Sequence, residues 1–391
     1  MTATNIGAVR NASEAAASGP AHVSEPTAYD GILLASFGGP EGQDDVIPFL
    51  RNVTRGRGIP DERLEEVAHH YRHFGGVSPI NAQNRALKAA LEAELAARGV
   101  DLPVFWGNRN WGPFLADALR EAADAGSTRL IAVATSAYSS YSSCRQYRED
   151  FARELDATGL ADTMVIDKVR QYFDHPGFVA PFTRGVADGL AELERKLPGV
   201  DLATEAHVLF CTHSIPMGDA ARSGPAERGF GEGGAYAAQH RAVAEVIMQR
   251  VGRDVPWDLV YQSRSGPPSQ PWLEPDVNDA LKQLGEDGVQ GVLLVPLGFV
   301  SDHMEVMWDL DEEAMETAEG LGITAVRTRT PGVEPAYVAG LVDLVLERVH
   351  GTPAADRKAE TALGPWYDVC RSGCCENARL GFRPAVAGLQ P

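Results

Sequence analysis

The sequence of 391 residues has no apolar run approaching the roughly 20 residues that a membrane-spanning helix requires. Its first residues, MTATNIGAVRNASEAAASGPAHVSEP, also lack the apolar core of a secretion signal. Both absences favour a soluble, cytoplasmic protein with no integral membrane segment. Because the opening stretch is polar and poor in large apolar side chains, we expect residues 1–27 to form a disordered extension.

Positive charge is also scarce. Lys and Arg number 35 against 54 Asp and Glu, so the net charge is -19. A charge of this sign disfavours nonspecific attraction to nucleic acid or to an anionic membrane, and we expect no nucleic-acid partner. An anionic substrate would have to be held by local clusters of arginine.

Cysteine occurs only five times, as Cys144, Cys211, Cys370, Cys374 and Cys375. The last three of these lie within six residues near the C-terminus. An odd number and this clustering argue against a disulfide framework and favour a reducing compartment. Cys211 lies inside an apolar run, where a free thiol behaves as a small core residue.

Short apolar runs rich in β-branched residues are abundant from residue 29 onward, and eight of them are typical of buried strands: GILLA, VFWG, RLIAVAT, MVIDKV, AHVLFC, DLVYQ, GVLLVPL and ITAVRT. Segments with a 3.6-residue period, such as 81–99 and 236–252, lie between them. This alternation predicts parallel sheets with right-handed crossovers.

Four of these runs precede residue 170 and four follow residue 205, with a helical stretch at 178–195 between the groups. We therefore predict an α/β fold of two Rossmann-like lobes, each with a parallel four-stranded sheet flanked by helices and with a substrate cleft between them. The expected divisions are a first lobe at 28–170, a second lobe at 171–333, a helix at 334–350 that packs back on the first lobe, and a tail with the cysteine cluster at 351–391.

Polar side chains follow two strands of the second lobe. Ligands bind beyond the carboxyl ends of strands in open parallel sheets, and His213 directly follows VLFCT at such an end. A partly desolvated imidazole there can accept a proton or bind a metal, although a structural role is an equal alternative. Glu305 follows VLLVPLGFVSDHM, and Asp309 and Glu313 repeat at the spacing of one helix face. The alternative is a solvated acidic helix start.

Two loops of the first lobe combine glycine with aromatic residues: YRHFGGVSPI at 71–80 and WGNRNWGPF at 106–114. Such loops suit a flat aromatic ligand, but they can equally form packed loop cores. Arg55 and Arg57 in TRGRG form a small basic spot that can hold carboxylates in bidentate fashion.

The motifs SFGGP, YRHFGGVSPINAQ, GNRNW, THSIP, QSRSGPPSQPWLEPDV and PLGFVSDHMEV, in this order and spacing, resemble the ferrochelatase family, and most closely its actinobacterial coproporphyrin branch. The resemblance covers about residues 29–350. It implies insertion of Fe(II) into coproporphyrin III to give coprohaem III in haem biosynthesis, by a lyase-class metal chelatase that binds its tetrapyrrole between two lobes. It also implies a monomer that makes transient contacts with other haem-pathway enzymes.

Carried over by motif, His213 and Glu305 are the catalytic and iron-binding residues, which we expect on opposite faces of the macrocycle. Which of them takes the pyrrole protons is left open. Asp309 and Glu313 match outer acidic positions that relay metal or protons. Arg55, Ser78 and Tyr147 match positions that contact substrate, whereas Arg57 is included only for its proximity.

Phe37 is a departure from the family pattern, because several relatives that use coproporphyrin carry an iron-binding tyrosine at this position. A phenyl ring offers no lone pair to a metal, although it can press on the macrocycle face and favour its distortion. The departure leaves more of the iron ligation to His213 and Glu305.

The clustered cysteines also match the family. Some members hold a 2Fe-2S cluster with one internal cysteine and three C-terminal ones, which implies Cys144, Cys370, Cys374 and Cys375 here. The adjacent Cys374 and Cys375 are not the commonest ligand spacing, so structural zinc and free thiols stay open as alternatives.

Three rival functions also remain open at this point. They are a protoporphyrin IX ferrochelatase of the same fold, a non-catalytic tetrapyrrole carrier or iron-sulfur sensor, and a cobalt or nickel chelatase for a more reduced tetrapyrrole. The presence of both His213 and Glu305 argues against the carrier.

Overall fold

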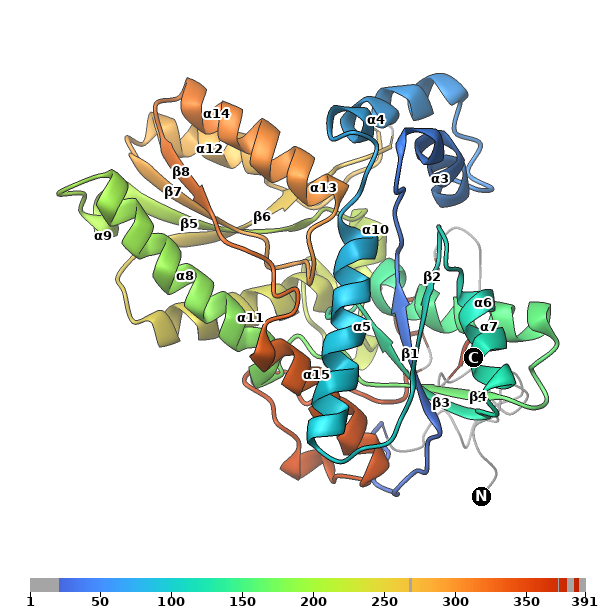
Figure 1. Ribbon diagram of the computed structural model, residues 1–391. Coiled ribbons are helices and arrows are strands. Elements are labelled where there is room, and N and C mark those ends of the chain that lie inside the picture. The colour runs from blue at the N-terminus through green and yellow to red at the C-terminus, as the bar shows by residue number, and fades with distance from the viewer. Residues whose placement is uncertain (1–20, 267–268, 372, 378–382, 387–391) are drawn as a thin grey trace.

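The computed structural model describes residues 21–266, 269–371, 373–377 and 383–386. It has two parallel four-stranded sheets, with strand orders β2-β1-β3-β4 and β6-β5-β7-β8 (Figure 1). The strands are β1 Gly31–Ser36, β2 Val104–Asn108, β3 Arg129–Ala134, β4 Val165–Lys168, β5 Ala206–His213, β6 Trp257–Gln262, β7 Gly291–Val295 and β8 Thr324–Arg327. All eight predicted strands are present, and the predicted fold class is confirmed.

Alternate residues of the central strands face two different helix layers, as the pleat of a strand requires. In β1, Ile32 and Leu34 join one core cluster, whereas Leu33 and Ala35 join another. In β5, Phe210 faces the large shared core and Cys211 faces a separate cluster. Both faces of each sheet are therefore buried, which explains the continuous apolar runs. Cys211 is part of the core.

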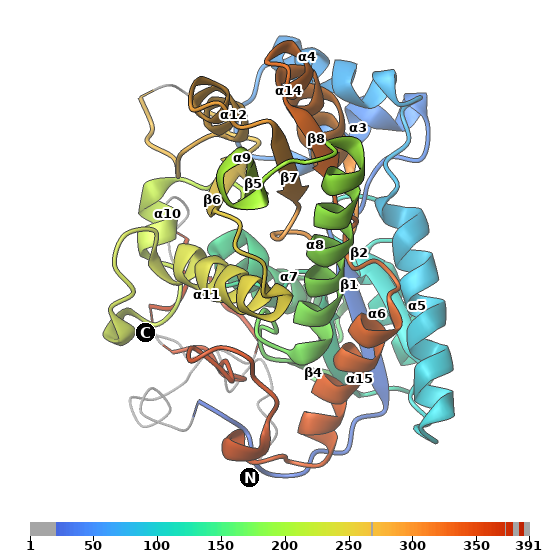
Figure 2. The ribbon, with the colours of Figure 1, turned by 90° about the vertical axis from the view of Figure 1, so that its left-hand side faces the viewer.

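The helices lie on both faces of the sheets, and Figure 2 shows α8 and α11 along the second sheet. Three predicted segments, 81–99, 178–195 and 236–252, correspond to α5, α8 and α11. The α-helices are α3 Val46–Val53, α4 Asp61–His73, α5 Ile80–Ala97, α6 Leu115–Asp124, α7 Gln146–Thr158, α8 Pro176–Lys196, α9 Leu202–Glu205, α10 Met217–Ala221, α11 Gly234–Val251, α12 Val277–Glu286, α13 Met304–Val306, α14 Met315–Gly320 and α15 Pro335–Val349. Two π-helices span Tyr141–Arg145 and Met307–Ala314.

Helix α15 connects the two lobes after the last strand. It packs against α5 of the first lobe and also against α8, which covers β7 and β8. Arg98 at the end of α5 forms an ion pair with Asp343 of α15, with Nη1 and Oδ1 2.6 Å apart. The lobes consequently share one continuous hydrophobic core that includes residues of α5, α8 and α15.

The predicted disordered extension is wrong for residues 21–27, and residues 1–20 lie outside the described part of the chain. The Val23 amide donates to the Asp368 carboxylate at 2.8 Å, and the Ala21 carbonyl accepts from the Asp368 amide at 2.9 Å. The Thr27 amide donates to the Arg348 carbonyl. The backbone of this polar segment is thus paired with residues more than 300 positions away.

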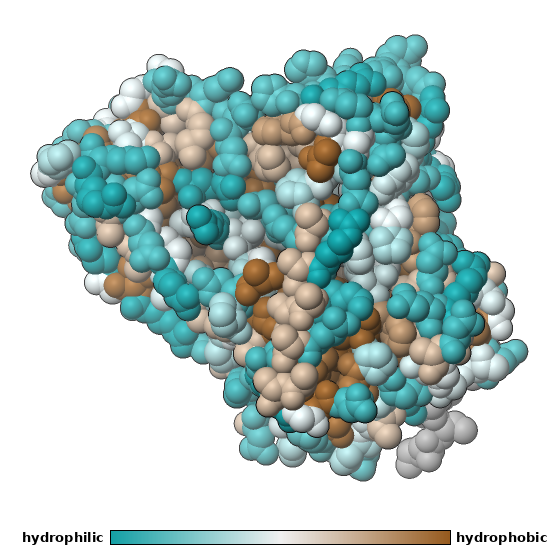
Figure 3. Space-filling view, viewed as in Figure 1, coloured by the Kyte–Doolittle hydropathy of each residue, from teal (hydrophilic) through white to brown (hydrophobic). Residues whose placement is uncertain are grey.

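None of the helices in the described ranges is long and apolar enough to cross a bilayer. The face of the molecule in Figure 3 is predominantly hydrophilic.

Candidate active site

His213 and Glu305 are in contact at the carboxyl end of the second sheet. His213 is the last residue of β5, and Glu305 lies in α13, the short helix that follows β7 and its loop. The His213 Nε2 and Glu305 Oε2 atoms are 3.6 Å apart, and the two side chains are 32% and 50% exposed. Both groups can therefore reach a ligand while they hold each other as an ion pair.

The direction of the His213 ring is set by a hydrogen bond to its neighbour. Its Nδ1 lies 2.5 Å from the Ser214 carbonyl oxygen, which can only accept, so Nδ1 carries a proton and donates it. The other ring nitrogen then faces Glu305. Burial lowers the pKa of His213, but the Glu305 charge and this hydrogen bond outweigh burial and raise it to about 9. Burial raises the pKa of Glu305, and the His213 charge outweighs it and lowers the value to about 2.

This contact differs from the expectation that the two residues act from opposite faces of a macrocycle. Nonbonded atoms pack at about 3.5–4.0 Å, so groups on either side of a flat ring stand about 7 Å apart. The observed 3.6 Å leaves no room for a ring between them.

Asp309 lies next to this pair, and Glu313 lies one step further along the same helix. Both belong to the π-helix Met307–Ala314, whose wide turn keeps residues four apart near one face. The side-chain amide of Gln262 donates to Asp309 Oδ2 at 3.1 Å and to the Glu305 carbonyl at 3.2 Å. Gln262 thus ties the two acids together.

Asp309 is the member of this acidic series that titrates near neutrality. Burial is the largest cause of its raised pKa of about 7, and the neighbouring charges of Glu305 and Glu313 add to it. The Ser263 hydroxyl donates to the same carboxylate and opposes the shift. Ser263 adopts a left-handed backbone with φ of 60°, which is uncommon outside glycine and orients this hydroxyl.

The first lobe contributes the loop that follows β1. The loop packs so closely on residue 78 that a Cβ atom on Gly39 would lie 2.7 Å from Ser78 Cβ and 2.8 Å from Ile80 Cγ2. The Ser78 amide donates to the Pro40 carbonyl at 2.9 Å. Two sequence motifs that resemble the family, SFGGP and FGGVSPI, therefore form one packed unit. Within it, Ser78 is buried and Phe37 is exposed.

Phe37 and Tyr147 flank a buried arginine. The Arg109 guanidinium lies 5.9 Å from the Phe37 ring centroid and 4.8 Å from that of Tyr147, and its Nε forms a 2.6 Å ion pair with Asp150. Tyr147 is only 3% exposed and belongs to the core behind β1. It lies one layer behind Phe37, so its predicted substrate contact would need Arg109 to move.

Arg55 lies at the end of α3, on the outer part of the first lobe. Its side chain is exposed and donates to Asn52 Oδ1 at 2.6 Å. No contact described for Arg55 holds its guanidinium against the β1 loop. The guanidinium is accessible to a ligand, but the structure does not show which ligand it binds. Arg57 is likewise exposed.

Helices α3 and α4 of the first lobe pack against the second lobe at this site. Met304, beside Glu305, packs into the apolar cluster formed by Val46, Phe49 and Tyr71. The Asp302 amide donates to Gln83 Oε1 of α5 at 2.9 Å. The segment that carries Glu305 is therefore fixed by contacts from both lobes.

The four predicted cluster cysteines form a buried group. Cys144 at the π-helix before α7 meets Cys370, Cys374 and Cys375 of the tail, all 6% exposed or less. The Cys374 and Cys375 sulfurs are 3.8 Å apart. Hydrogen bonds from Cys144 and Cys374 lower the pKa of Cys370. Sequence positions more than 220 residues apart are thus brought together.

The four cysteines lie close together, but their arrangement is not that of a metal site. Within the described ranges, no group of three or more His, Cys, Asp or Glu side chains is arranged to hold a metal ion. The finding applies to the acidic series as well as to the cysteines. The structure therefore supports the gathering of these residues, and it does not support a preformed 2Fe-2S or iron site.

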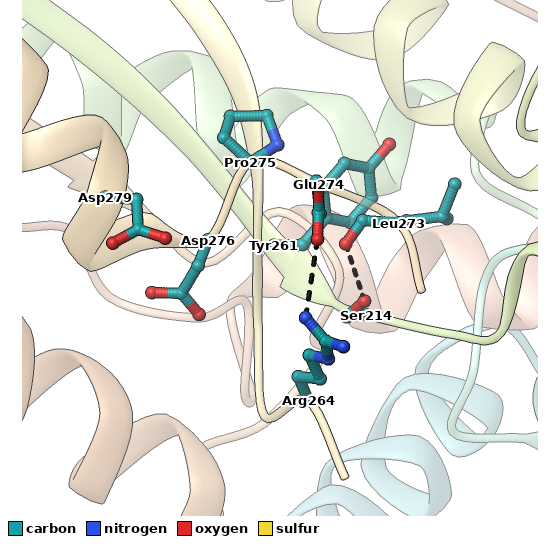
Figure 4. Close-up of a pocket in the computed structure, with 8 residues that line it drawn as sticks. All are labelled: Ser214, Tyr261, Arg264, Leu273, Glu274, Pro275, Asp276 and Asp279. Atoms are coloured by element: carbon teal, nitrogen blue, oxygen red, sulfur yellow. Dashed lines mark hydrogen bonds and ion pairs between the residues drawn. The ribbon is translucent and has the colours of Figure 1, made fainter. Parts of the chain in front are cut away.

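A cavity of about 340 Å³ opens beside the His213 strand end (Figure 4). Ser214, Leu273 and Arg264 lie along it, and the Ser214 hydroxyl donates to the Leu273 carbonyl at 2.8 Å. Arg264 forms a 3.4 Å ion pair with Glu274 across the opening. The wall of this cavity is the loop that supports Ser214, so it belongs to the scaffold of His213.

The sequence as a whole matches the family model described as ferrochelatase over residues 29–349. The chain belongs to the ferrochelatase family. The family membership inferred from the motifs is therefore confirmed, and it identifies the protein as a metal chelatase.

Ferrochelatases similar to this chain cover nearly its whole length. It is 69% identical to a coproporphyrin III ferrochelatase of Leifsonia xyli over 97% of this chain and 99% of the relative. It is 56% identical to a coproporphyrin III ferrochelatase of Tropheryma whipplei, with 93% of each covered. A protein named ferrochelatase in Rhodopirellula baltica is 46% identical over 94% of this chain and 99% of the relative.

Sequence reasoning missed three residues that shape this ferrochelatase site. Arg109 and Gln262 lie in the motifs GNRNW and QSRSG, which carried the resemblance without a role for either side chain. His303 precedes Met304, and its Nδ1 lies 4.0 Å from Glu305 Oε2. Burial lowers the pKa of His303, so this second imidazole is neutral beside the ion pair.

Proposed function

We propose that this protein inserts Fe(II) into coproporphyrin III to give coprohaem III in haem biosynthesis. The observation that carries the proposal is the His213–Glu305 pair, with its nitrogen and oxygen 3.6 Å apart, at the junction of two lobes of a ferrochelatase-family chain. The relatives named coproporphyrin III ferrochelatase favour this substrate over protoporphyrin IX.

The reaction exchanges one dication for two protons. Each pyrrole N-H that faces iron must lose its proton, and the iron must exchange water for the four ring nitrogens. A temporary ligand and a nearby proton acceptor are therefore needed on the face from which iron arrives. Glu305, already ionised at neutral pH, supplies a carboxylate on this face. The raised pKa of His213 keeps its ring protonated beside Glu305, so its Nε2 can bind iron or accept a pyrrole proton only after that nitrogen has released its own proton.

We propose that the acidic series links this pair to solvent. Asp309 changes its charge near pH 7, so it can take up a proton and release it under working conditions. The Glu313 carboxylate accepts from the Trp308 indole at 2.8 Å and is exposed. Glu305, Asp309 and Glu313 follow one another from the His213–Glu305 pair to the exposed Glu313, which suits an outward proton path or an inward metal path.

The first lobe is proposed to hold the porphyrin. Coproporphyrin III has more propionates than protoporphyrin IX, and the exposed Arg55 can pair with one of them. The Ser78 hydroxyl borders the β1 loop and is proposed to bind a second carboxylate. Phe37 is 39% exposed and is proposed to lie against the macrocycle, with Tyr147 in support behind Arg109.

An anaerobic assay with ferrous iron and each porphyrin tests this function. We expect metallation of coproporphyrin III at a higher kcat/KM than protoporphyrin IX, followed by the change in the visible spectrum. A preference for protoporphyrin IX would support the rival ferrochelatase. Binding of both porphyrins without metallation would support a carrier and would refute the proposed activity.

We also propose that Cys144, Cys370, Cys374 and Cys375 hold a 2Fe-2S cluster. A 2Fe-2S cluster is held by four cysteine thiolates. The four buried thiols from two distant segments match that number and would hold the cluster. Metal insertion transfers no electrons, so we propose a structural role for the cluster. When bound, it would cross-link the π-helix before α7 to the tail.

The charges around the cysteines support this proposal. Arg148 and Lys168 are fully buried beside them, and the nearby thiols Cys370 and Cys144 help to raise the pKa of Arg148. Buried cations are costly unless they are compensated, and an anionic thiolate cluster would compensate them. Anaerobically purified protein should be brown, with matching iron and sulfide contents and an iron-sulfur absorption that Cys374→Ser abolishes. Colourless protein with zinc, or with neither metal, would refute the cluster.

We propose further that the chain acts as a cytoplasmic monomer that contacts other haem-pathway enzymes transiently. The thiols of the described cysteines are all free, which suits a reducing compartment. Light scattering coupled to size exclusion tests the monomer, and a dimer mass at micromolar concentration would refute it.

A further inference from the structure

The peptide group between His213 and Ser214 is held at both ends. Its carbonyl, from His213, accepts a 2.8 Å hydrogen bond from the hydroxyl of Tyr236. Its N-H, from Ser214, donates to the Gln262 carbonyl of β6 at 2.8 Å. A planar peptide fixed at both of its polar groups cannot rotate about the strand axis without breaking one of these bonds.

The next peptide group contains the acceptor of the His213 ring. The Ser214 carbonyl accepts from Nδ1, and its direction follows from the two backbone dihedrals of Ser214. The Ser214 side chain is itself fixed, because its hydroxyl donates to the Leu273 carbonyl (Figure 4). A change in the first peptide plane would therefore turn the Ser214 carbonyl away from the imidazole.

Tyr236 reaches this peptide from α11, in the interior of the second lobe. It is 4% exposed, and its amide donates to the Ser223 hydroxyl at 2.9 Å. Its own hydroxyl lies 2.8 Å from Thr212 Oγ1, which in turn lies 3.0 Å from His240 Nε2. The Thr212, Tyr236 and His240 side chains are buried, and the Tyr236 hydroxyl has two protein groups within reach, the His213 carbonyl and Thr212 Oγ1, each at 2.8 Å.

We propose that Tyr236 is a positioning residue for His213: its hydroxyl fixes the 213–214 peptide, and thereby keeps Nδ1-H on the Ser214 carbonyl and Nε2 directed at the reaction site. Tyr236 touches neither substrate nor iron in this arrangement. The inference deepens the proposed function at the same site, but the placement of the ring can be tested without turnover.

The test compares Tyr236→Phe with two matched variants in the full-length protein. Tyr337→Phe removes another buried tyrosine hydroxyl, which contacts Tyr172 in the core far from the site. Thr212→Val removes a hydroxyl of the Tyr236 network and leaves the Tyr236–His213 bond in place. Tyr337→Phe therefore controls for loss of stability alone, whereas Thr212→Val shows whether the rest of the network adds to the bond between Tyr236 and His213.

The first readout is NMR of apoprotein carrying 15N-labelled histidine. The Nδ1-H signal of His213 should be observable and slow to exchange in the parent, in Tyr337→Phe and in Thr212→Val. It should exchange faster or disappear in Tyr236→Phe. Retention of this signal in folded Tyr236→Phe would overturn the proposal, whether or not the protein metallates any porphyrin.

The second readout is steady-state insertion of iron. Tyr236→Phe should lower kcat by about 3- to 10-fold, the rate equivalent of one neutral hydrogen bond, with little change in the KM for porphyrin. Tyr337→Phe should keep kcat within about twofold of the parent. An equal loss of kcat in Tyr337→Phe would refute a specific role for Tyr236.

Discussion

The imidazole of His70 lies flat on the indole of Trp308, with ring centroids 4.0 Å apart and planes inclined by 5°. His70 belongs to α4 of the first lobe, and Trp308 lies in the π-helix that carries Asp309 and Glu313. The stack therefore joins the two lobes next to the acidic series, since Trp308 directly precedes Asp309. This aromatic contact helps to decide how the series faces the rest of the site.

Removal of the stack by His70→Ala should loosen the π-helix without unfolding the protein. An aromatic pair is worth about 0.5–1.5 kcal/mol, so local opening of the segment should increase by about 3- to 10-fold. Hydrogen exchange across 304–314 measures this change. The exposed His350 on α15 provides the control, and His350→Ala should leave exchange in the segment unchanged. Unchanged exchange in His70→Ala would show that the stack does not restrain the helix.

Loss of Glu305 should lower the pKa of His213. The value of about 9 results from the Glu305 charge, which outweighs the opposing effect of burial. In Glu305→Gln the burial effect is no longer outweighed, so the pKa should fall by more than one unit. NMR titration of the His213 ring measures it. A pKa that stays near 9 would contradict the ion pair.

The same pair should stabilise the fold only within a window of pH. The raised pKa of His213 means that its contribution is complete below the unfolded value of 6.5 and is lost as pH rises through about 9. The lowered pKa of Glu305 means that its contribution is complete above 4.5 and is lost as pH falls towards about 2. Urea unfolding from pH 3 to 10 should show these losses in the parent and smaller ones in Glu305→Gln.

Replacement of the imidazole should separate chemistry from binding. We expect His213→Ala to lower kcat by at least about 100-fold, the lower end of what a positioned acid or base contributes, while porphyrin still binds. Fluorescence quenching of the porphyrin measures binding. His207 lies at the opposite end of β5 and pairs with Asp258, so His207→Ala should retain turnover. Near-parental turnover in His213→Ala would refute the proposed role.

The β1 loop should tolerate a methyl group at one glycine and not at another. Gly39→Ala would place its Cβ 2.7 Å from Ser78, and overpacking of this kind costs about 1–3 kcal/mol. Gly42→Ala meets nothing within 4 Å and has an extended backbone, so it should be neutral. Urea unfolding measures stability, and porphyrin titration should show weaker binding in Gly39→Ala alone. Equal behaviour of the two variants would contradict the tight packing of this loop on Ser78.

The strands could be predicted because their physical cause is local. Both faces of β1 and β5 are covered, so most residues of these runs are apolar or small, and the pattern is visible in the sequence itself. The strand ends then indicated His213 and Glu305. Their contact on one side could not be predicted, because it depends on how α13 and β5 approach each other in space.

Long-range pairing explains what the sequence did not reveal. Residues 21–27 have a polar composition that is typical of disorder, yet their backbone groups find partners such as Asp368 that composition cannot indicate. Tyr236 lies in a helix that periodicity predicts, but its hydroxyl acts on a carbonyl 23 residues away. Local patterns specify the elements, whereas hydrogen bonds between elements specify the site.

The number of residues in the π-helix Met307–Ala314 affects the geometry of this site. A π-helix has more residues per turn than an α-helix, so it directs the same side chains to different angles around the helix axis. Deletion of one residue would let the segment rewind as an ordinary helix and would turn everything after the deletion by about 100°. A deletion between Glu305 and Asp309 would turn Asp309 and Glu313 together by about 100° relative to Glu305, although every acid would still be present. Alignments of this segment should therefore be compared by register, since a homologue one residue shorter would keep the acidic composition and lose the path.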